Sequence, residues 1–267
     1  MKKYMAFFRL RFSMGLQYRV AALAGVATQF TWGGMLIMIY KAFYEADAAA
    51  FPMSFRATAS YIWLQQAFFS FFAVWMMENE IFDVIVNGNI AYELCRPVRI
   101  YNMWFARGLA NRLARAALRC APILVVAAFL PEPYGITAPA SAFHFFAFFV
   151  TLILGLLVTL AFCMLVYVLA FFTISPQGLR IVFVSLVEFF AGAVIPLPFF
   201  PEKFKAFMEL LPFAAMQNVP LRIYSGSMTA GEMEKNVALQ VFWLVFLLLG
   251  GSLLCRYAER KVTVQGG

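Results

Sequence analysis

One carboxylate stands well inside a hydrophobic run of this sequence. Glu188 lies in the apolar segment 181–194, and helical spacing places Ser185 and Gly192 on the same face as Glu188. An ionisable side chain at bilayer depth is costly, and by default it indicates a functional site. Glu188 is therefore a candidate for contacting a transported molecule. The alternative is a buried carboxyl, protonated or paired with an arginine, that holds helices together.

Arginines form the second group of candidate functional side chains. Arg112, Arg115 and Arg119 recur at spacings of three and four, so they share one helix face, and Arg107 lies nearby. Beyond Arg119 only about 16 Å of helix remains before Leu130, at roughly 1.5 Å per residue. These guanidinium groups line a water-filled cavity, or sit in a short tilted span, or pair with preceding acidic residues. We favour pairing with Glu78, Glu80 and Asp83.

Residue types that support catalysis or cofactor binding are sparse. The sequence contains no G-x-x-x-x-G-K-[ST] motif, so it lacks the loop that grips ATP phosphates. His144 is the only histidine, and the spacing of the four cysteines fits no metal site. Neither G-x-S-x-G nor H-E-x-x-H occurs. We predict no catalytic residue, no metal site and no cofactor bound by this chain.

The composition indicates a membrane protein. Of 267 residues, 64% are hydrophobic and 13% are charged, whereas soluble domains carry about 25% charged residues. Several apolar runs approach the roughly 20 residues that a helix needs to cross a bilayer. The net charge of +8 fits lysines and arginines in cytoplasmic loops against anionic lipid, and we expect no nucleic-acid partner.

The elements that must position the candidate residues are six membrane-spanning helices. We predict spans at about residues 20–44, 59–77, 102–130, 142–172, 181–194 and 237–254. Residues 2–17 read as an amphipathic helix in the membrane interface, with Met5, Phe8 and Phe12 on its apolar face. The alternative is a first turn that only anchors span one. The expected fold is an all-α membrane protein.

Two connecting segments carry further structure. Between spans two and three, Asn87-Gly88-Asn89 predicts a turn, and residues 90–95 predict a short helix that ends before Pro97. After span five, an apolar stripe between Pro201 and Pro212 predicts a helix too short to span. We expect this helix to lie on, or re-enter, the outer leaflet.

The distribution of lysine and arginine predicts the orientation. The predicted external loops hold far fewer of these residues than the cytoplasmic side; the external set is Lys41, Arg56, Lys203, Lys205, Arg222 and Lys235. Because positive residues concentrate in cytoplasmic loops, both termini are expected in the cytoplasm.

Two stretches resemble a known family. The run N-G-N-I-A-Y-E-L-C-R-P at 87–97 resembles the gate-helix region of ABC type-2 exporter permeases, in particular the daunorubicin-resistance-like permeases. The run A-G-A-V-I-P-L-P-F-F-P at 191–201, followed by Leu211-Pro-Phe213, resembles the span-five exit and external re-entrant helices of that family. With the six-span layout, the resemblance covers essentially the whole chain, 1–267, as one transmembrane permease domain.

The resemblance implies a permease for an amphipathic or lipid-like compound in the cytoplasmic (inner) membrane of a bacterium. It implies a second permease subunit, identical or related, and separate ATPase subunits that bind ATP and Mg. The residues implied in coupling to the ATPase are Arg9, Arg11, Gly88, Tyr92, Glu93, Arg96 and Pro97. The polar candidates for the substrate pathway are Gln65, Gln66, Ser185 and Glu188.

Two other classes of function stay open at this point. A membrane-embedded enzyme acting on lipid would use Glu188 or an arginine near the headgroups, but no His, Asp or Ser constellation accompanies them. A non-transporting membrane scaffold or sensor would show no stimulation of an ATPase by any substrate.

Overall fold

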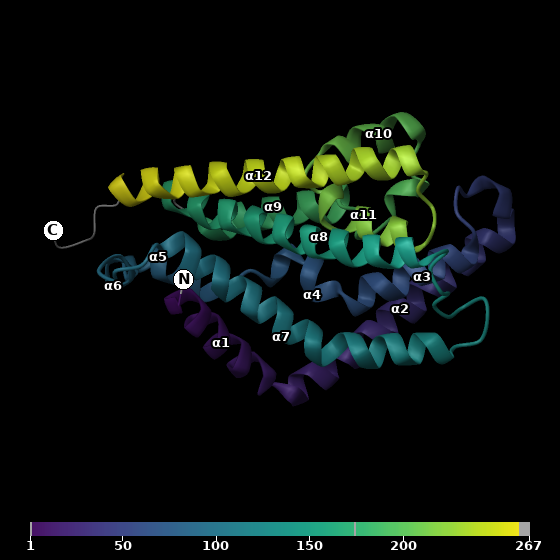
Figure 1. Cartoon of the computed structure of the whole chain (residues 1–267), viewed down its shortest axis with the longest axis horizontal. Helices are drawn as coiled ribbons and strands as arrows, with labels where there is room; N and C mark the ends of the chain where they lie inside the picture. The colour runs from purple at the N-terminus through teal and green to yellow at the C-terminus, as the bar shows by residue number, and fades with distance from the viewer. Residues whose placement is uncertain (1, 174, 262–267) are drawn as a thin grey trace.

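The computed structural model describes residues 2–173 and 175–261, and every regular element in these ranges is helical (Figure 1). The predicted all-α class is therefore confirmed for the described residues. The last residues of the predicted cytoplasmic tail, 262–267, lie outside them. The elements in chain order are α1 (Lys2–Leu16), α2 (Arg19–Asp47), η1 (Ala48–Ala50), α3 (Phe55–Ala67), α4 (Phe69–Phe72), η2 (Val74–Met76), α5 (Asn79–Val86), α6 (Ile90–Leu94), α7 (Ile100–Phe129), α8 (Ala142–Leu169), η3 (Ala170–Phe172), α9 (Pro176–Phe190), η4 (Leu197–Phe199), α10 (Glu202–Leu210), α11 (Ala214–Tyr224) and α12 (Ala230–Lys261).

Three helical segments are long and apolar enough to cross a membrane. They are Arg19–Ala50, Ala142–Phe172 and Ala230–Lys261, with 32, 31 and 32 residues. These correspond to predicted spans one, four and six. Helix α7 has 30 residues, but its arginines make it less apolar. Six spans and re-entrant helices remain a prediction.

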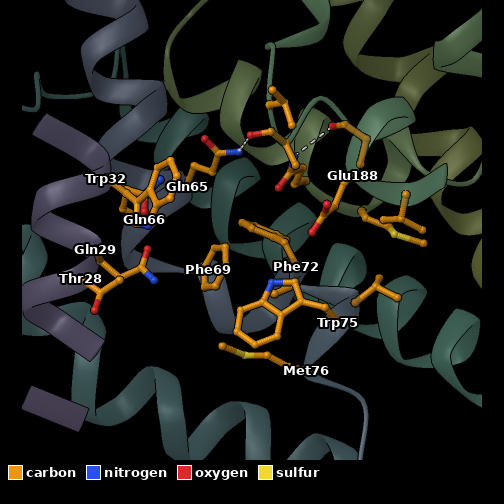
Figure 2. A pocket seen from close by; sticks show the side chains of 18 of the residues that line it. Thr28, Gln29, Trp32, Gln65, Gln66, Phe69, Phe72, Trp75, Met76 and Glu188 are labelled. Atoms are coloured by element: carbon orange, nitrogen blue, oxygen red, sulfur yellow. Dashed lines mark hydrogen bonds between the residues drawn. The ribbon is translucent and has the colours of Figure 1, made fainter. Parts of the chain in front are cut away.

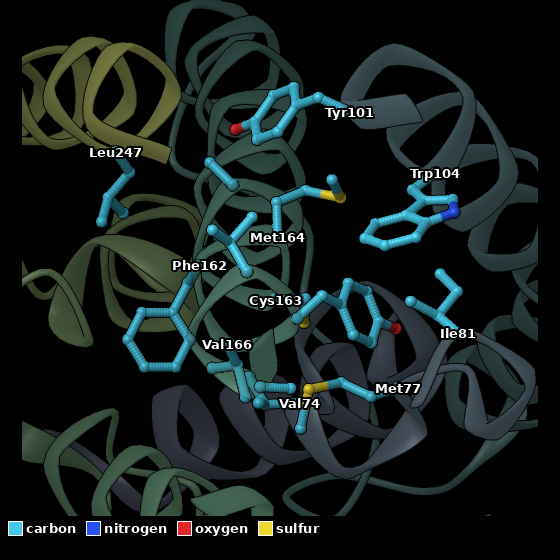
Figure 3. Packing of buried hydrophobic residues seen from close by; sticks show 14 of the residues in the cluster. Val74, Met77, Ile81, Tyr101, Trp104, Phe162, Cys163, Met164, Val166 and Leu247 are labelled. Atoms are coloured by element: carbon cyan, nitrogen blue, oxygen red, sulfur yellow. The ribbon is translucent and has the colours of Figure 1, made fainter. Parts of the chain in front are cut away.

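Helix α8 lies at the centre of the packing. It contacts α4, α7, α9, α11 and α12. Figure 3 shows Met164 of α8 on the side of Tyr101 and Trp104 of α7, whereas Phe162 of α8 lies on the other side, toward Leu247 of α12. Trp104 of α7 stacks on Phe171 of η3, with ring centroids 6.2 Å apart. The core is therefore assembled around one helix that neighbours enclose.

Predicted span two is not one continuous helix. The chain forms α3, ends it at the cap residue Phe68, and continues as α4 and η2. No proline causes the break. Beyond the break, the buried guanidinium of Arg112 on α7 donates to the backbone oxygens of Ser70 (2.7 Å) and Phe71 (3.3 Å). A charged donor from another helix thus satisfies carbonyl groups near the end of α4.

The segments around predicted span five also differ from expectation. Helix α9 begins at Pro176, with Ser175 accepting a hydrogen bond from the Gly178 N–H, and it ends at Phe190 instead of reaching residue 194. The predicted short helix after Pro201 is confirmed as α10. Helix α11 was not predicted, because Pro220 lies inside it.

The N-terminal helix packs along α7. Met5 of the predicted apolar face and Arg9 of the opposite face are both exposed, and the position of α1 in the membrane interface stays a prediction. Arg11 of α1 points toward α5, where its Nη2 lies 3.9 Å from Glu80 Oε2. The start of α1 and the end of α12 lie toward the same end of the molecule as α5 and α6, whereas α10 lies toward the other end (Figure 1).

Candidate functional site

A cavity of about 540 Å³ lies between α2, the α3–α4–η2 segment, α9 and α11. We call it the central cavity; Figure 2 shows Glu188 on one side of it and Gln29 and Trp32 on the other. Its walls are mostly apolar, with a few amide and charged groups. The lining residues are Gly25, Thr28, Gln29, Trp32, Leu36, Gln65, Gln66, Phe69, Phe72, Ala73, Val74, Trp75, Met76, Arg119, Val187, Glu188, Ala191, Ala193, Val194, Met216 and Gln217.

The central cavity brings together three of the four predicted pathway residues. Gln65 and Gln66 come from α3 and Glu188 comes from α9, and all three line it. Ser185, one turn earlier on α9, is exposed and does not line the cavity. The helical spacing placed Ser185 and Glu188 on one face, but only the later turn of α9 reaches the cavity.

Two glutamines position the chain that follows α9. Gln65 Nε2 donates to the Ala193 carbonyl at 3.0 Å, and Gln217 Nε2 of α11 donates to the Ala191 carbonyl at 3.1 Å. These bonds satisfy backbone acceptors just beyond the end of α9. The amide of Gln65 therefore has a structural partner, whereas the buried Oε1 of Gln29 has none in the part of the chain that the structure describes.

Glu188 is exposed within the single chain, and no described residue forms an ion pair with it. The alternative of a buried, arginine-paired carboxyl is therefore wrong for this chain taken alone. The carboxylate stands in an otherwise apolar wall with Val187 and Val194, so it supplies a charge that the fold itself does not neutralise.

A second cavity of about 650 Å³ adjoins the first. We call it the arginine cavity. Trp75, Met76 and Arg119 line both cavities. The remaining lining residues of the arginine cavity are Arg11, Met14, Gly15, Tyr18, Ala21, Ala22, Met77, Glu78, Asn79, Glu80, Asn111, Arg115, Leu118 and Arg180.

The predicted pairing of arginines with acidic residues holds for Arg107 only. Arg107 forms an ion pair with Glu80, and its Nε lies 3.9 Å from Glu78 Oε2. The pairing is wrong for the three-residue stripe. Arg112 bonds to backbone carbonyls, the closest polar contact of Arg119 is the Ala21 carbonyl at 3.5 Å, and Arg115 contacts no carboxylate among the described residues. For Arg112, carbonyl groups of α4 take the place of the expected carboxylates.

The predicted turn and short helix between spans two and three are confirmed. Gly88 has φ +70°, a conformation that residues with a side chain rarely adopt, and α6 follows. Tyr92 is 74% exposed, and Arg96 and Pro97 are exposed beside it. Glu93 instead faces inward and accepts a hydrogen bond from Trp104 Nε1 at 2.7 Å. Helix α6 thus presents an open surface while being tied to α7.

The two predicted coupling arginines of α1 have different surroundings. Arg9 is exposed, whereas Arg11 is partly buried and lines the arginine cavity. Helix α5, which begins after Met77 and Glu78 beyond the end of η2, was not predicted. The backbone N–H of Glu78, at this junction, donates to Tyr167 Oη at 2.6 Å.

A buried ion-pair network was not predicted. Arg222 of α11 donates to Glu209 of α10 at 2.6 Å and to Glu232 of α12 at 3.2 Å. Arg222 and Glu209 are almost fully buried. No local spacing signals this network, because its three members lie on three different helices.

Comparison with known proteins adds one finding to this geometry. A family model described as "ABC-2 family transporter protein" matches residues 25–266. Among proteins of curated function, no match to this chain was found.

Proposed function

This chain belongs to the ABC-2 transporter family and is a multi-pass membrane permease of an ABC transporter; from that premise we propose that it exports an amphipathic or lipid-like compound, energised by a separate ATPase. The proposal places the protein in the cytoplasmic membrane of a bacterium with both termini in the cytoplasm. A second permease subunit, identical or related, completes the pathway.

The central cavity is the observation that carries this proposal. Ligand sites in proteins are concavities of about 300–1,000 Å³ with mostly apolar walls and a few polar groups. The central cavity, at about 540 Å³, matches that description, with Trp32, Phe69 and Phe72 among its apolar groups. Gln29, Gln66 and Glu188 supply the polar groups. An amphipathic molecule matches both kinds of wall.

Helices α6 and α1 supply a route by which a partner ATPase acts on the cavity. In the proposal, the ATPase binds ATP and Mg and presses on the exposed surface of α6 around Tyr92 and Arg96, and on Arg9 of α1. Glu93 links α6 to Trp104 of α7, and α1 packs along α7. Arg112 of α7 in turn holds the α4 backbone that forms the cavity wall. Movement at the exposed surface therefore has a bonded path to the cavity.

Purification of the full-length tagged protein from its native cells tests the proposed assembly. Co-purifying chains are identified by mass spectrometry after extraction in mild detergent. We expect an ATPase with a phosphate-binding loop in stoichiometric amount, with or without a second permease. A lone protein, from cells shown to express such an ATPase, would contradict the proposal.

The link between α6 and α7 yields a first prediction. Replacing Glu93 with Gln or Trp104 with Phe weakens or removes a charge-assisted hydrogen bond worth about 1.5–3 kcal/mol, so transport per ATP hydrolysed should fall roughly tenfold. Membrane insertion and ATP hydrolysis should persist. The measurement is paired transport and hydrolysis in proteoliposomes of the complex. Glu234→Gln, an exposed glutamate on α12, is the matched control, and unchanged coupling in both α6–α7 variants would remove this route.

The carboxylate in the central cavity yields a second prediction. Because Glu188 has no ion-pair partner among the described residues, Glu188→Gln should leave folding intact. Removing its charge should lower export of cationic amphiphiles severalfold relative to anionic ones of equal tail length. Substrate-stimulated ATP hydrolysis measures the ratio. A variant that only misfolds would assign Glu188 a structural role instead.

A further inference from the structure

The arginine cavity holds positive charge that the fold leaves unneutralised. Its acidic residues are already engaged: Glu80 pairs with Arg107 and lies 3.9 Å from Arg11, and Glu78 accepts a hydrogen bond from Asn111 at 2.8 Å. Both carboxylates therefore contact side chains of α1 or of the first half of α7. Among the described residues, neither carboxylate pairs with Arg115 or Arg119, which lie about two and three turns beyond Arg107 on α7.

Arg115 and Arg119 are the arginines without carboxylate partners. Arg115 has no hydrogen-bond or ion-pair partner within the described residues. Arg119 reaches only the Ala21 carbonyl, at 3.5 Å, and its buried Nε has no partner there. Arg180, also in the cavity wall, is held by the Asn79 side chain and by the Trp75 carbonyl at 2.6 Å. Two partly buried guanidinium groups thus face one cavity with free donors.

Partly buried guanidinium groups without protein partners indicate a site for an anion. A guanidinium group matches phosphate and carboxylate oxygens with two parallel N–H donors. Partial burial strengthens that attraction, because fewer water molecules screen it. Two such groups on successive turns of one helix provide several donors for one anionic head.

The adjoining central cavity supplies apolar walls, which an anion without an apolar tail would not need. Arg119, Trp75 and Met76 line both cavities, so the two cavities adjoin at these three side chains. On one side lie the guanidinium groups of Arg115 and Arg119. On the other side lie Trp32, Phe69, Phe72 and other apolar groups. The lining therefore changes from guanidinium groups to apolar side chains where the two cavities adjoin.

We propose that the two adjoining cavities recognise an anionic amphiphile, with its phosphate-like head on Arg115 and Arg119 and its apolar tail in the central cavity. This inference rests on the proposed transport function and specifies its substrate class. A cationic amphiphile is less well matched, because Glu188 is the single acidic residue of the central cavity and Arg119 lines that cavity too. The anionic head belongs to a membrane lipid or to a free compound.

Binding of charged probes to the full-length protein tests the proposal. The protein is placed in phosphatidylcholine nanodiscs and titrated with dodecyl phosphate, dodecyltrimethylammonium or inorganic phosphate, and the heat of binding is corrected with empty nanodiscs. We expect dodecyl phosphate to bind most tightly. Inorganic phosphate should bind at least roughly tenfold more weakly, because burial of the tail also contributes to the affinity.

Charge-removing variants locate the head of the probe. The double variant Arg115→Gln/Arg119→Gln should bind dodecyl phosphate at least about tenfold more weakly, since hydrogen bonds to charged groups are the strong ones. Arg115→Lys/Arg119→Lys retains the charge and should recover part of the affinity. The matched control, Arg256→Gln/Arg260→Gln, removes two exposed arginines near the end of α12 and should bind like the unmodified protein.

Contrary outcomes are equally specific. Tighter binding of dodecyltrimethylammonium, weakened by Glu188→Gln, would replace the anionic class with a cationic one. Equal binding of inorganic phosphate and dodecyl phosphate would remove the tail site, and equal loss in the control variant would remove the assignment to Arg115 and Arg119. Replacing part of the phosphatidylcholine with phosphatidylglycerol separates the sources within the proposal: competition identifies a lipid, and unchanged binding identifies a free amphiphile. Because these titrations need no ATPase, a failure here leaves the co-purification result standing.

Discussion

Replacing Arg222 with methionine should lower the free energy of unfolding by about 3–5 kcal/mol, the cost of leaving a buried carboxylate without its partner. The side chains of Arg222 and Glu209 are 4% and 7% exposed, and their Nη1 and Oε1 atoms lie 2.6 Å apart. Arg222 also donates to the Ser227 carbonyl at 2.9 Å and to Glu232. One side chain therefore fastens α10 and the start of α12 to α11. The loss should appear as earlier thermal unfolding in detergent, followed by size-exclusion chromatography after heating.

Two further variants separate the mechanism from general damage. Adding Glu209→Leu to Arg222→Met removes the orphaned charge and should restore much of the lost stability. Arg56→Met breaks an exposed ion pair with Glu132 and should cost at most about 1 kcal/mol. If Arg222→Met and Arg56→Met unfolded at the same temperature, the buried network would not contribute more stability than an exposed ion pair.

Replacing Gly155 with alanine should be as damaging, although it adds only a methyl group. A Cβ atom on Gly155 of α8 would lie 2.1 Å from the carbonyl oxygen of Met216 on α11. The obstacle is backbone, so the two helices would have to separate. We expect the free energy of unfolding to fall by about 3 kcal/mol or more, at the upper end of overpacking costs.

The close approach has a chemical reason as well as a steric one. Within an α-helix the N–H of Pro220 would donate to the Met216 carbonyl, but proline has no N–H. That carbonyl instead lies against Gly155 of α8. Gly250→Ala is the matched control, because Gly250 is also inside a long helix and nothing lies within 4 Å of its added Cβ. The measurement is thermal unfolding of both variants in the same detergent. A similar loss of stability in the two variants would mean that alanine is harmful at any helix glycine, and that the contact with Met216 is not the cause.

The elements that local sequence specifies were the ones predicted well. Long apolar runs identified α8 and α12, and the Asn87-Gly88-Asn89 turn identified the start of α6. The carboxylate inside an apolar run singled out Glu188, the resemblance added Gln65 and Gln66 as pathway candidates, and the structure brings these three to one cavity. Each of these predictions needed only a short window of sequence or a family pattern.

The elements that depend on distant partners were the ones missed. The end of α4 is stabilised by Arg112, which lies 42 positions from Ser70, and no feature of residues 59–77 predicts this contact. Helix α11 was overlooked because Pro220 is a helix breaker in isolation. In the fold, α11 contacts α8, and Gln240 of α12 donates to its Ala215 carbonyl at 2.8 Å. Long-range contacts outweigh the local preference in both cases.

The central position of α8 bears on how the molecule is made. Within its most apolar stretch 72% of the residues are buried by the rest of the chain, whereas for α12 the share is 17%. The segment best suited to enter lipid on its own during synthesis thus ends up surrounded by protein. In the last step of assembly, α8 exchanges contacts with lipid for contacts with other helices. Close packing drives that exchange more than the hydrophobic effect does. Substitutions in α8 that keep its apolar character would still insert normally and then fail at assembly, so the defect would be met by the cell's quality-control proteases after insertion.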